Sequence, residues 1–261
     1  MRLLISIILL LISTNIKAQE SCTFPNICFK ENESVLYHVY YNVSFIWVNA
    51  GEVNFTTAKE KIGNKDVFHI IGDGKTYPSY DWIFKVRDRY ESFIDANELI
   101  PIKFIRNANE GGYQIYNHVL FNNAENKATS TNGTFKVPKC VQDVLSSIYY
   151  ARNIDFSNKK KGDKVFFNMF LDDKVYPIYL TYLGKEKIKT KYGTFNSIKF
   201  SPTLIAGTIF KEGDAMTVWV SDDANHVPVR INSPISVGSI KVDLMKFTNL
   251  KYPFTSLISK N

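Results

Sequence analysis

The residue types that most often carry catalysis are few in this chain and do not cluster. Its four histidines, His38, His69, His118 and His226, stand singly, and no Gly-x-Ser-x-Gly elbow, His-Glu-x-x-His helix, Cys-x-x-Cys pair or phosphate-binding glycine loop occurs. A lone histidine in a strand is more often a structural residue than a metal ligand or a base. We therefore predict that the protein is not an enzyme and has neither a cofactor nor a metal site.

Cys140 is the strongest single candidate for a nucleophile. The pattern of the residues that follow places it at the start of a helix, where the backbone dipole stabilises a thiolate. A cysteine nucleophile also needs a base, and no histidine lies near Cys140 in the sequence. We therefore interpret Cys140 as a structural thiol. Two alternatives stay open for the others, a local Cys22–Cys28 disulfide or three reduced thiols.

Two pairs of carboxylates offer the remaining catalytic or metal-binding chemistry. A polysaccharide hydrolase would need two carboxyl groups about 5 to 10 Å apart across a cleft. Asp81 and Asp88 are separated by an odd number of residues, so a single strand directs them to opposite faces. Asp222 and Asp223 lie in an Asp/Asn-rich turn that lacks the spaced oxygen ligands and the glycine of a calcium loop, which favours a role in the turn itself.

Asp88 interrupts the apolar face of the clearest predicted strand. Apolar and charged residues alternate over residues 80–94, and Asp88 stands at a position where an apolar residue is expected. Because an unpaired buried carboxylate is costly, we expect Asp88 either in an ion pair with Arg230 or Arg106 or as a polar anchor in a ligand site. Of these two roles, the sequence favours the ion pair.

The aromatic content motivates a ligand-binding site on that apolar face. The chain has 15 Tyr, 19 Phe and 3 Trp, more than a well-packed core ordinarily requires. Ligand pockets are lined mainly by apolar and aromatic groups with a few polar anchors. The predicted ligand-binding residues are Trp47, Tyr80, Trp82, Phe84 and Tyr90, with Asp88 and Arg230 as the polar anchors.

Alternation with period two extends over most of the chain and predicts a mainly β protein. About a dozen such runs, separated by turns rich in Gly, Asn and Asp, imply an antiparallel sheet. Residues 140–152 instead carry apolar side chains at helical spacing. A large sheet must close or cover its apolar face. We therefore predict a large curled antiparallel sheet, a half-barrel, with one substantial helix against its concave face, in a single domain over residues 19–261.

The N-terminus predicts export. Residues 1–18 show a basic start, a short apolar run and a small residue, Ala18, before the expected cleavage site, which is the order of a secretory signal peptide. The apolar run is shorter than the about 20 residues of a transmembrane helix, so no transmembrane segment is expected. The net charge of +7 falls to +5 when Arg2 and Lys17 are removed, and no basic cluster indicates nucleic-acid binding.

Several segments together resemble the DUF3108 family of exported bacterial proteins. The resemblance covers roughly residues 33–250 and is carried by residues 80–92, 141–147, 149–153, 189–195 and 217–223. It implies a Gram-negative source similar to the Bacteroidota, and therefore a periplasmic location. It also implies a half-barrel β fold similar to YmcC-like proteins and to lipoprotein carriers of the LolA and LolB type. The family has no established activity and no catalytic residues to transfer.

Three functional hypotheses follow. The leading one is a non-enzymatic envelope protein that holds a lipid, a lipidated protein or a glycolipid in the hollow of the half-barrel. The second is a structural or assembly factor that binds another envelope protein through a sheet edge or an aromatic patch. The third, a polysaccharide hydrolase, is weakened by the placement of Asp81 and Asp88.

Overall fold

The structure is a computed structural model that describes residues 22, 25, 28–43, 46–205, 215–235 and 238–261. The predicted signal peptide, residues 1–18, lies outside the described residues. No helix in the described part of the chain is long and apolar enough to cross a membrane.

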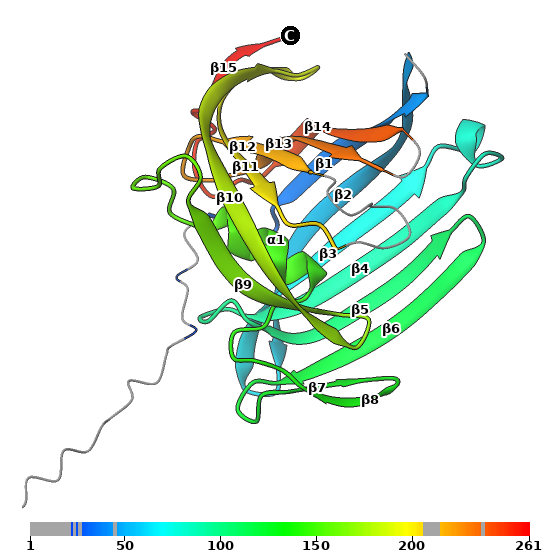
Figure 1. Cartoon of the computed structure of the whole chain (residues 1–261), viewed down its shortest axis with the longest axis vertical. Helices are drawn as coiled ribbons and strands as arrows, with labels where there is room; N and C mark the ends of the chain where they lie inside the picture. The colour runs from blue at the N-terminus through cyan, green and yellow to red at the C-terminus, as the bar shows by residue number, and fades with distance from the viewer. Residues whose placement is uncertain (1–21, 23–24, 26–27, 44–45, 206–214, 236–237) are drawn as a thin grey trace, which may run out of the picture.

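Fifteen strands form one antiparallel sheet, which confirms the predicted fold class (Figure 1). The strands are paired in the order β8-β7-β6-β5-β4-β3-β2-β1-β14-β13-β12-β11-β10-β9, and β15 pairs with β11. This path does not return to its start, so the sheet formed by the described residues stays open. The strand bounds are Ser34–Val43, Ile46–Ile62, Lys65–Thr76, Val86–Asp95, Pro101–Glu110, Tyr113–Asn122, Lys127–Ser130, Gly133–Lys136, Lys164–Leu171, Lys174–Lys189, Gly193–Pro202, Thr217–Ser221, Pro228–Pro234, Ser239–Thr248 and Leu257–Lys260 for β1 to β15.

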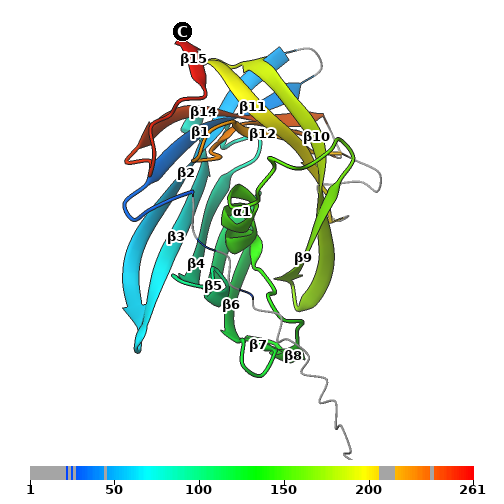
Figure 2. The same cartoon turned by 90° about the vertical axis from the view of Figure 1, so that its left-hand side faces the viewer.

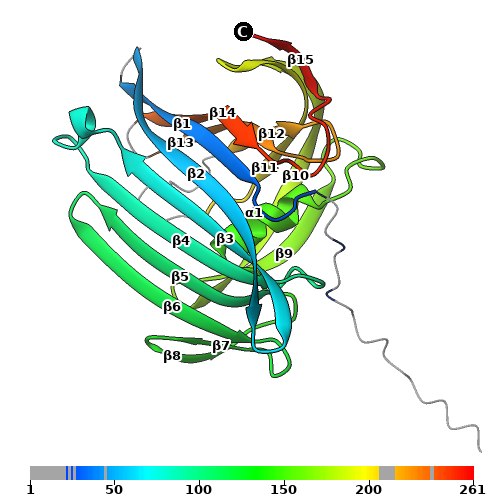
Figure 3. The ribbon, with the colours of Figure 1, turned by 180° about the vertical axis from the view of Figure 1, so that it is seen from behind.

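The sheet curls around the single helix, α1 (Val144–Arg152), as predicted. In Figure 2 α1 lies between β3–β6 on one side and β9–β10 on the other. Register shifts in the central strand β1, at Leu36/Tyr37 against β14 and at Val39/Tyr40 against β2, increase the local twist that bends the sheet. We call the face toward α1 the inner face; the outer face of β1–β6 is turned to the viewer in Figure 3.

The helix packs against both walls of the curled sheet. Leu145 and Tyr149 belong to a buried cluster with Ile70 and Ile94 of β3 and β4. Tyr150 belongs to a second cluster, which includes side chains of β10, β11 and β12. The helix therefore provides the apolar contacts that an open sheet cannot make with itself.

The helix begins later than its apolar pattern predicts. Asp143 is the N-cap: its carboxylate accepts a hydrogen bond from the Ser146 amide at 2.8 Å, and its own amide donates to Ser146 Oγ at 2.7 Å. Ser92 of β4 donates to the second Asp143 oxygen at 2.5 Å. Gln142 instead pairs with Met169 of β9. The prediction that Cys140 starts the helix is therefore wrong, because Cys140 lies in a turn with a φ of +59° and Gln142 pairs with the sheet.

The guanidinium of Arg152, the last helical residue, is buried and donates hydrogen bonds to several acceptors. It donates to both Glu33 carboxylate oxygens, at 2.6 and 3.0 Å, and to the carbonyls of Asn225 and Cys28. The side chains of Arg152 and Glu33 are 4% and 1% exposed. This cluster joins the helix to the segment before β1 and to the β12–β13 turn.

The predicted strand over residues 80–94 is wrong in its first part. β4 begins at Val86, and residues 78–80 form a short 3₁₀ helix, η1 (Pro78–Tyr80), in the connection from β3. The amides of Tyr80 and Ile83 donate to the carbonyls of Tyr77 and Tyr80, so the backbone bonds to itself instead of to a neighbouring strand. Apolar residues recur at every second position in residues 80–85, as they do in a strand. The turn that begins at Pro78 nevertheless places this segment outside the sheet.

The cysteines pair across the molecule and not locally. Cys22 and Cys140 form a disulfide, and Cys28 is a buried thiol outside any disulfide that donates to the Arg152 carbonyl at 2.8 Å. The two predicted alternatives, a Cys22–Cys28 bond or three reduced thiols, are therefore both wrong, as is the interpretation of Cys140 as a free thiol. A stable disulfide indicates an extracytoplasmic location.

We predict that the one thiol outside the disulfide, Cys28, reacts only after unfolding. Cys28 is fully buried, and burial raises its pKa to about 11, so little thiolate is available in the folded state. A thiol reagent should label no cysteine in the native protein and one cysteine, Cys28, in guanidinium chloride. After reduction in guanidinium chloride it should label all three. Peptide mapping that locates the alkylated residue at Cys140 or Cys22 would contradict the assigned pairing.

We also predict that the Arg152–Glu33 pair is essential to stability. Arg152→Met leaves a buried Glu33 carboxylate without its partner, which should lower the free energy of unfolding by about 3 to 5 kcal/mol. Urea denaturation measures the change. The matched control is Arg87→Met, because Arg87 binds Asp81 at 2.6 Å on a partly exposed site and should cost no more than about 1 kcal/mol. Equal losses for the two variants would contradict a special role for the buried pair.

Candidate functional site

An apolar hollow of about 330 Å³ lies between α1 and the inner face of β1–β4. On the helix side it is lined by Val144, Leu145 and Ile148. On the sheet side it is lined by Val39, Ala50, Gly51, Glu52, Val53, Phe55, Gly72, Gly74, Lys75, Thr76, Val86, Asp88 and Tyr90. The helix therefore fills only part of the concave face, and the remaining space lies at the lower end of the about 300 to 1,000 Å³ usual for small-molecule pockets.

Two glycines of β3 set the shape of this hollow. A Cβ atom on Gly72 would lie 3.2 Å from Phe55 Cε1 and 3.4 Å from Leu145 Cδ2, so glycine permits the close approach of the helix. A Cβ atom on Gly74 would find nothing nearer than Asp88 Cβ, at 3.9 Å. Gly72 thus brings α1 onto the sheet, whereas Gly74 leaves the adjoining space empty.

Two acidic residues, Glu52 and Asp88, border this hollow; Glu52 is paired with Lys75, and Asp88 lacks the ion-pair partners predicted for it. Asp88 Oδ1 accepts a hydrogen bond from the Asn109 amide at 3.0 Å. Burial, together with the nearby charge of Glu110, raises the pKa of Asp88 to about 6. Arg230 is bonded to Asp243, at 2.6 and 2.7 Å.

The second predicted partner is also occupied elsewhere. Arg106 of β5 forms its ion pair with Asp172, in the β9–β10 turn. The prediction of an Asp88 ion pair with Arg230 or Arg106 is therefore wrong: each arginine lies nearer to another carboxylate supplied by a neighbouring element. Near pH 6 Asp88 can hold a proton and donate a hydrogen bond, and above that pH it is an anion beside an apolar space.

The structure gathers only part of the predicted ligand-binding set. Asp88 and Tyr90 line the hollow. Trp47, Trp82 and Phe84 are instead exposed, and Tyr80 lies in η1, all near the connections at one end of the sheet. Arg230 lies on β13 with Asp243. A role of these residues in binding stays a prediction, but most of them do not line this hollow.

Most of the lining was missed in the sequence analysis, although two signals for it exist. Val53 and Phe55 follow the inward period of β2, and Gly72-Asp73-Gly74 interrupts the apolar side chains of β3 at inward positions. The helical residues Val144, Leu145 and Ile148 belong to the stripe that predicted the helix. No local pattern shows that these three segments meet.

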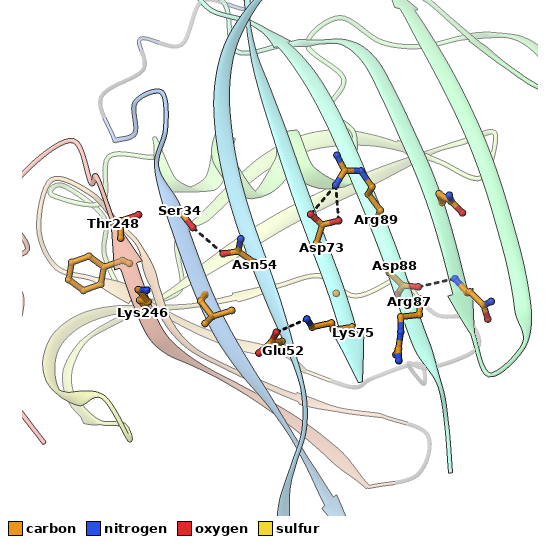
Figure 4. A pocket seen from close by; sticks show the side chains of 15 residues that line it. Ser34, Glu52, Asn54, Asp73, Lys75, Arg87, Asp88, Arg89, Lys246 and Thr248 are labelled. Carbon is orange, nitrogen blue, oxygen red and sulfur yellow. Dashed lines mark hydrogen bonds and ion pairs between the residues drawn. The ribbon is translucent and has the colours of Figure 1, made fainter. Parts of the chain in front are cut away.

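A larger groove of about 820 Å³ lies on the outer face of the same strands (Figure 4). Its charges neutralise one another: Lys75 contacts Glu52 at 3.0 Å, and Arg89 contacts Asp73 at 2.9 Å. Figure 4 shows these pairs side by side along the strands. The groove thus carries two ion pairs among apolar and polar side chains, whereas the lining of the inner hollow is mainly apolar.

Three of the histidines make structural contacts. His38 lies 3.2 Å from the Asn49 side chain, His226 lies 2.6 Å from the Arg152 carbonyl, and His69 contacts both Glu60 and Glu91 at 2.8 Å. These contacts agree with the structural roles expected for single histidines.

The raised pKa of Asp88 gives a pH-dependent prediction. Because its folded pKa of about 6 exceeds the ordinary pKa of 3.8 for an aspartate carboxyl, the folded state binds this proton more tightly, and stability falls as the pH rises from about 4 to about 6. Asp88→Asn removes the buried charge, so at about pH 8 it should raise the free energy of unfolding by about 1 kcal/mol, and at about pH 4 it should have little effect.

Urea denaturation over this pH range measures the difference. The matched control is Asp73→Asn on the outer face, which removes the partner of Arg89 and should give no gain at any pH. A gain for Asp88→Asn that persists undiminished in acid would contradict a titrating carboxyl at this position.

Three solved structures are similar to this chain to different degrees. A beta-barrel-like protein of the domain of unknown function DUF1849 from Brucella abortus has 8% sequence identity and a TM-score of 0.57, with 86% of this chain and 100% of that chain covered. A "putative lipoprotein" from Parabacteroides distasonis has 12% identity and a TM-score of 0.37, covering 87% and 99%. A "putative exported protein" with a YmcC-like fold from Bacteroides fragilis has 11% identity and a TM-score of 0.31, covering 87% and 100%.

Of these three proteins, the one from Brucella shares the overall fold of this chain. No curated protein sequence matches the chain. The model of the family described as "Protein of unknown function (DUF3108)" matches residues 36–245, which confirms the resemblance found in the sequence. The chain belongs to the DUF3108 family.

Proposed function

We propose that this chain is an exported, non-enzymatic protein of the bacterial envelope that holds the apolar part of an amphipathic ligand in the hollow beside α1. The ligand class is a lipid, a lipidated protein or a glycolipid. The observation that carries the proposal is the hollow itself, an apolar space of about 330 Å³ that the helix and the sheet border together but do not fill.

The shape and lining of the hollow favour a narrow apolar group. Val53 and Phe55 form one wall, Val144 and Ile148 form the other, and Gly74 adds no side chain between them. An acyl chain placed there would exchange water for apolar contacts on both sides, which is favourable by about 25 cal/mol per Å² of apolar surface buried.

Asp88 adds the polar anchor that an amphipathic ligand requires. Its carboxyl borders the apolar space and is satisfied in the protein by the Asn109 amide. In the protonated form it can donate a hydrogen bond to an ester, amide or hydroxyl oxygen of a ligand. In the ionised form it favours a ligand that carries a cation near its apolar part.

The periplasm is the compartment that best fits these features. The Cys22–Cys140 disulfide requires an oxidising environment, and residues 1–18 have the pattern of a signal peptide. Amphipathic lipids and lipidated proteins are abundant at the membranes that enclose this compartment.

The alternative role of an assembly factor that binds through a sheet edge has weaker support. β9 is an end strand of the sheet, but Gln142 bonds to it from its free side: the Gln142 amide donates to Asn168, and the Phe170 amide donates to Gln142, both at 2.8 Å. The other end strand, β8, has only four residues. Short and covered edges discourage the addition of a further strand.

The test is to fill the hollow without displacing any wall. Gly74→Leu inserts a side chain where a Cβ has free space, so it should weaken binding of the apolar fluorescent probe N-phenyl-1-naphthylamine about tenfold or more, and Gly74→Ala should have a smaller effect. Fluorescence titration measures the affinity, and urea denaturation checks that each variant is folded.

The matched control is Asn107→Leu, which adds the same side chain on the outer face of β5 and should bind the probe as the natural protein does. Unchanged probe affinity in folded Gly74→Leu, or no probe binding by the natural protein, would overturn the proposal.

A further inference from the structure

Large apolar side chains are exposed together at one end of the sheet. The start of β2 and the β3–β4 and β5–β6 connections lie at this end, because consecutive strands run antiparallel (Figure 1, right-hand side). Trp82 is 82% exposed, and five further side chains of these segments are also exposed. We call this set the aromatic rim: Ile46, Trp47, Trp82, Ile83, Phe84 and Tyr113.

Hydrogen bonds fix the conformation of the loop that carries residues 82–84, the most exposed part of the rim. Asp81 accepts hydrogen bonds from Thr76 at 2.6 Å and from Arg87 at 2.6 Å, which ties the loop to the ends of β3 and β4. Trp82 Nε1 donates to the Ser79 carbonyl at 3.0 Å. The loop thus presents its apolar side chains in a defined arrangement.

A glycine in the neighbouring β5–β6 turn allows the ring of Phe84 to pack closely against that turn. Gly111 has a φ of +60°, and a Cβ on it would lie 2.5 Å from Phe84 Cε2, so the Phe84 ring lies directly on the β5–β6 turn. The chain keeps two bulky apolar residues, Trp82 and Ile83, in water beside this contact. Exposed apolar side chains grouped in this way mark an interaction surface.

The chemistry of the rim fits a lipid bilayer. Trp and Tyr prefer the interface between the headgroups and the acyl chains, and Ile and Phe enter the acyl region. Basic side chains accompany them: Lys85 is exposed directly after Phe84, and Lys241 Nζ lies 4.2 Å from the centre of the Trp47 ring. Lysine next to apolar tips adds attraction to anionic headgroups.

The position of the rim relative to the hollow supports the same partner. Ala50, Thr76 and Val86 line the hollow, and each lies within four residues of a rim residue or of η1. The hollow therefore extends from α1 toward the end of the sheet that carries the rim.

We infer that the aromatic rim docks this protein on the surface of an anionic phospholipid bilayer, with Trp82, Ile83 and Phe84 entering the interface. The inference goes beyond ligand binding, because it is carried by the exposed side chains and holds whether or not the hollow takes a ligand.

The test uses vesicles of phosphatidylethanolamine and phosphatidylglycerol with the oxidised full-length mature protein. In a Trp47→Phe/Trp219→Phe variant the emission of Trp82 should shift to the blue on addition of vesicles and should be quenched by brominated acyl chains. In co-sedimentation, Trp82→Ser/Phe84→Ser should lower the partition coefficient about tenfold or more. Should the single-tryptophan variant be unfolded, a blue shift that Trp47→Phe keeps and Trp47→Phe/Trp82→Phe loses gives the same information.

Two matched controls isolate the rim. Phe166→Ser and Leu120→Ser remove exposed apolar side chains, 67% and 47% exposed, that lie along β9 and in the second half of β6, away from the rim, and both should sediment as the natural protein does. Gly74→Leu should lose probe binding but still dock, which separates failure of this inference from failure of the proposed function.

Two results would overturn the inference. One is natural protein that stays in the supernatant with unshifted Trp82 emission. The other is a dimer, detected by light scattering without vesicles, that Trp82→Ser/Phe84→Ser abolishes, because the rim would then be an interface between two copies of the chain.

Discussion

The position of α1 depends on the buried ion pair between Arg152 and Glu33. A buried guanidinium is tolerated only when its donors are satisfied, and here a carboxylate and two backbone carbonyls from distant parts of the chain supply the acceptors. At the other end of α1, Ser92 bonds to the capping Asp143. The helix is thus fixed at both ends to different parts of the structure, and the inner hollow has a definite width because of these two attachments.

The hollow is the outcome of a short helix inside a wide, open sheet. Nine helical residues cover part of the inner face, and the glycines of β3 decide where contact ends and empty space begins. Filling the space with larger side chains would gain packing energy, about 0.8 kcal/mol for each buried methylene group. A glycine in a strand interior costs stability instead. Glycine at position 74 is therefore less favourable for stability than a larger apolar residue would be. Residues that lower stability in this way are common at binding sites.

The sequence predicted what local periodicity determines and missed what distant contacts determine. Alternation of apolar and polar residues predicted the strands of the antiparallel sheet, and apolar residues at helical spacing predicted α1. Both predictions succeed because each pattern repeats within a single element. The start of α1 was misplaced because Gln142 bonds to β9, and Trp82 and Phe84 were assigned to a strand because alternation does not reveal the turn at Pro78. The Cys22–Cys140 bond and the partners of Arg106 and Arg230 depend on residues far apart in the sequence, which spacing cannot reveal.

The disulfide divides the chain into two parts that should differ in how easily they unfold locally. The part inside the disulfide loop is cross-linked, and the part after it is not. Residues 22–140 form a covalently closed ring that contains β1 to β8. The strands β9 to β15 contact this ring through the β1–β14 ladder, the Arg106–Asp172 ion pair, the packing of Phe170 and the helix α1. Cross-linking restricts the unfolded ensemble only inside the ring. Because the disulfide lies outside β9–β15, an opening that detaches these strands would keep the ring closed and leave the Gly72–Gly74 side of the hollow in place.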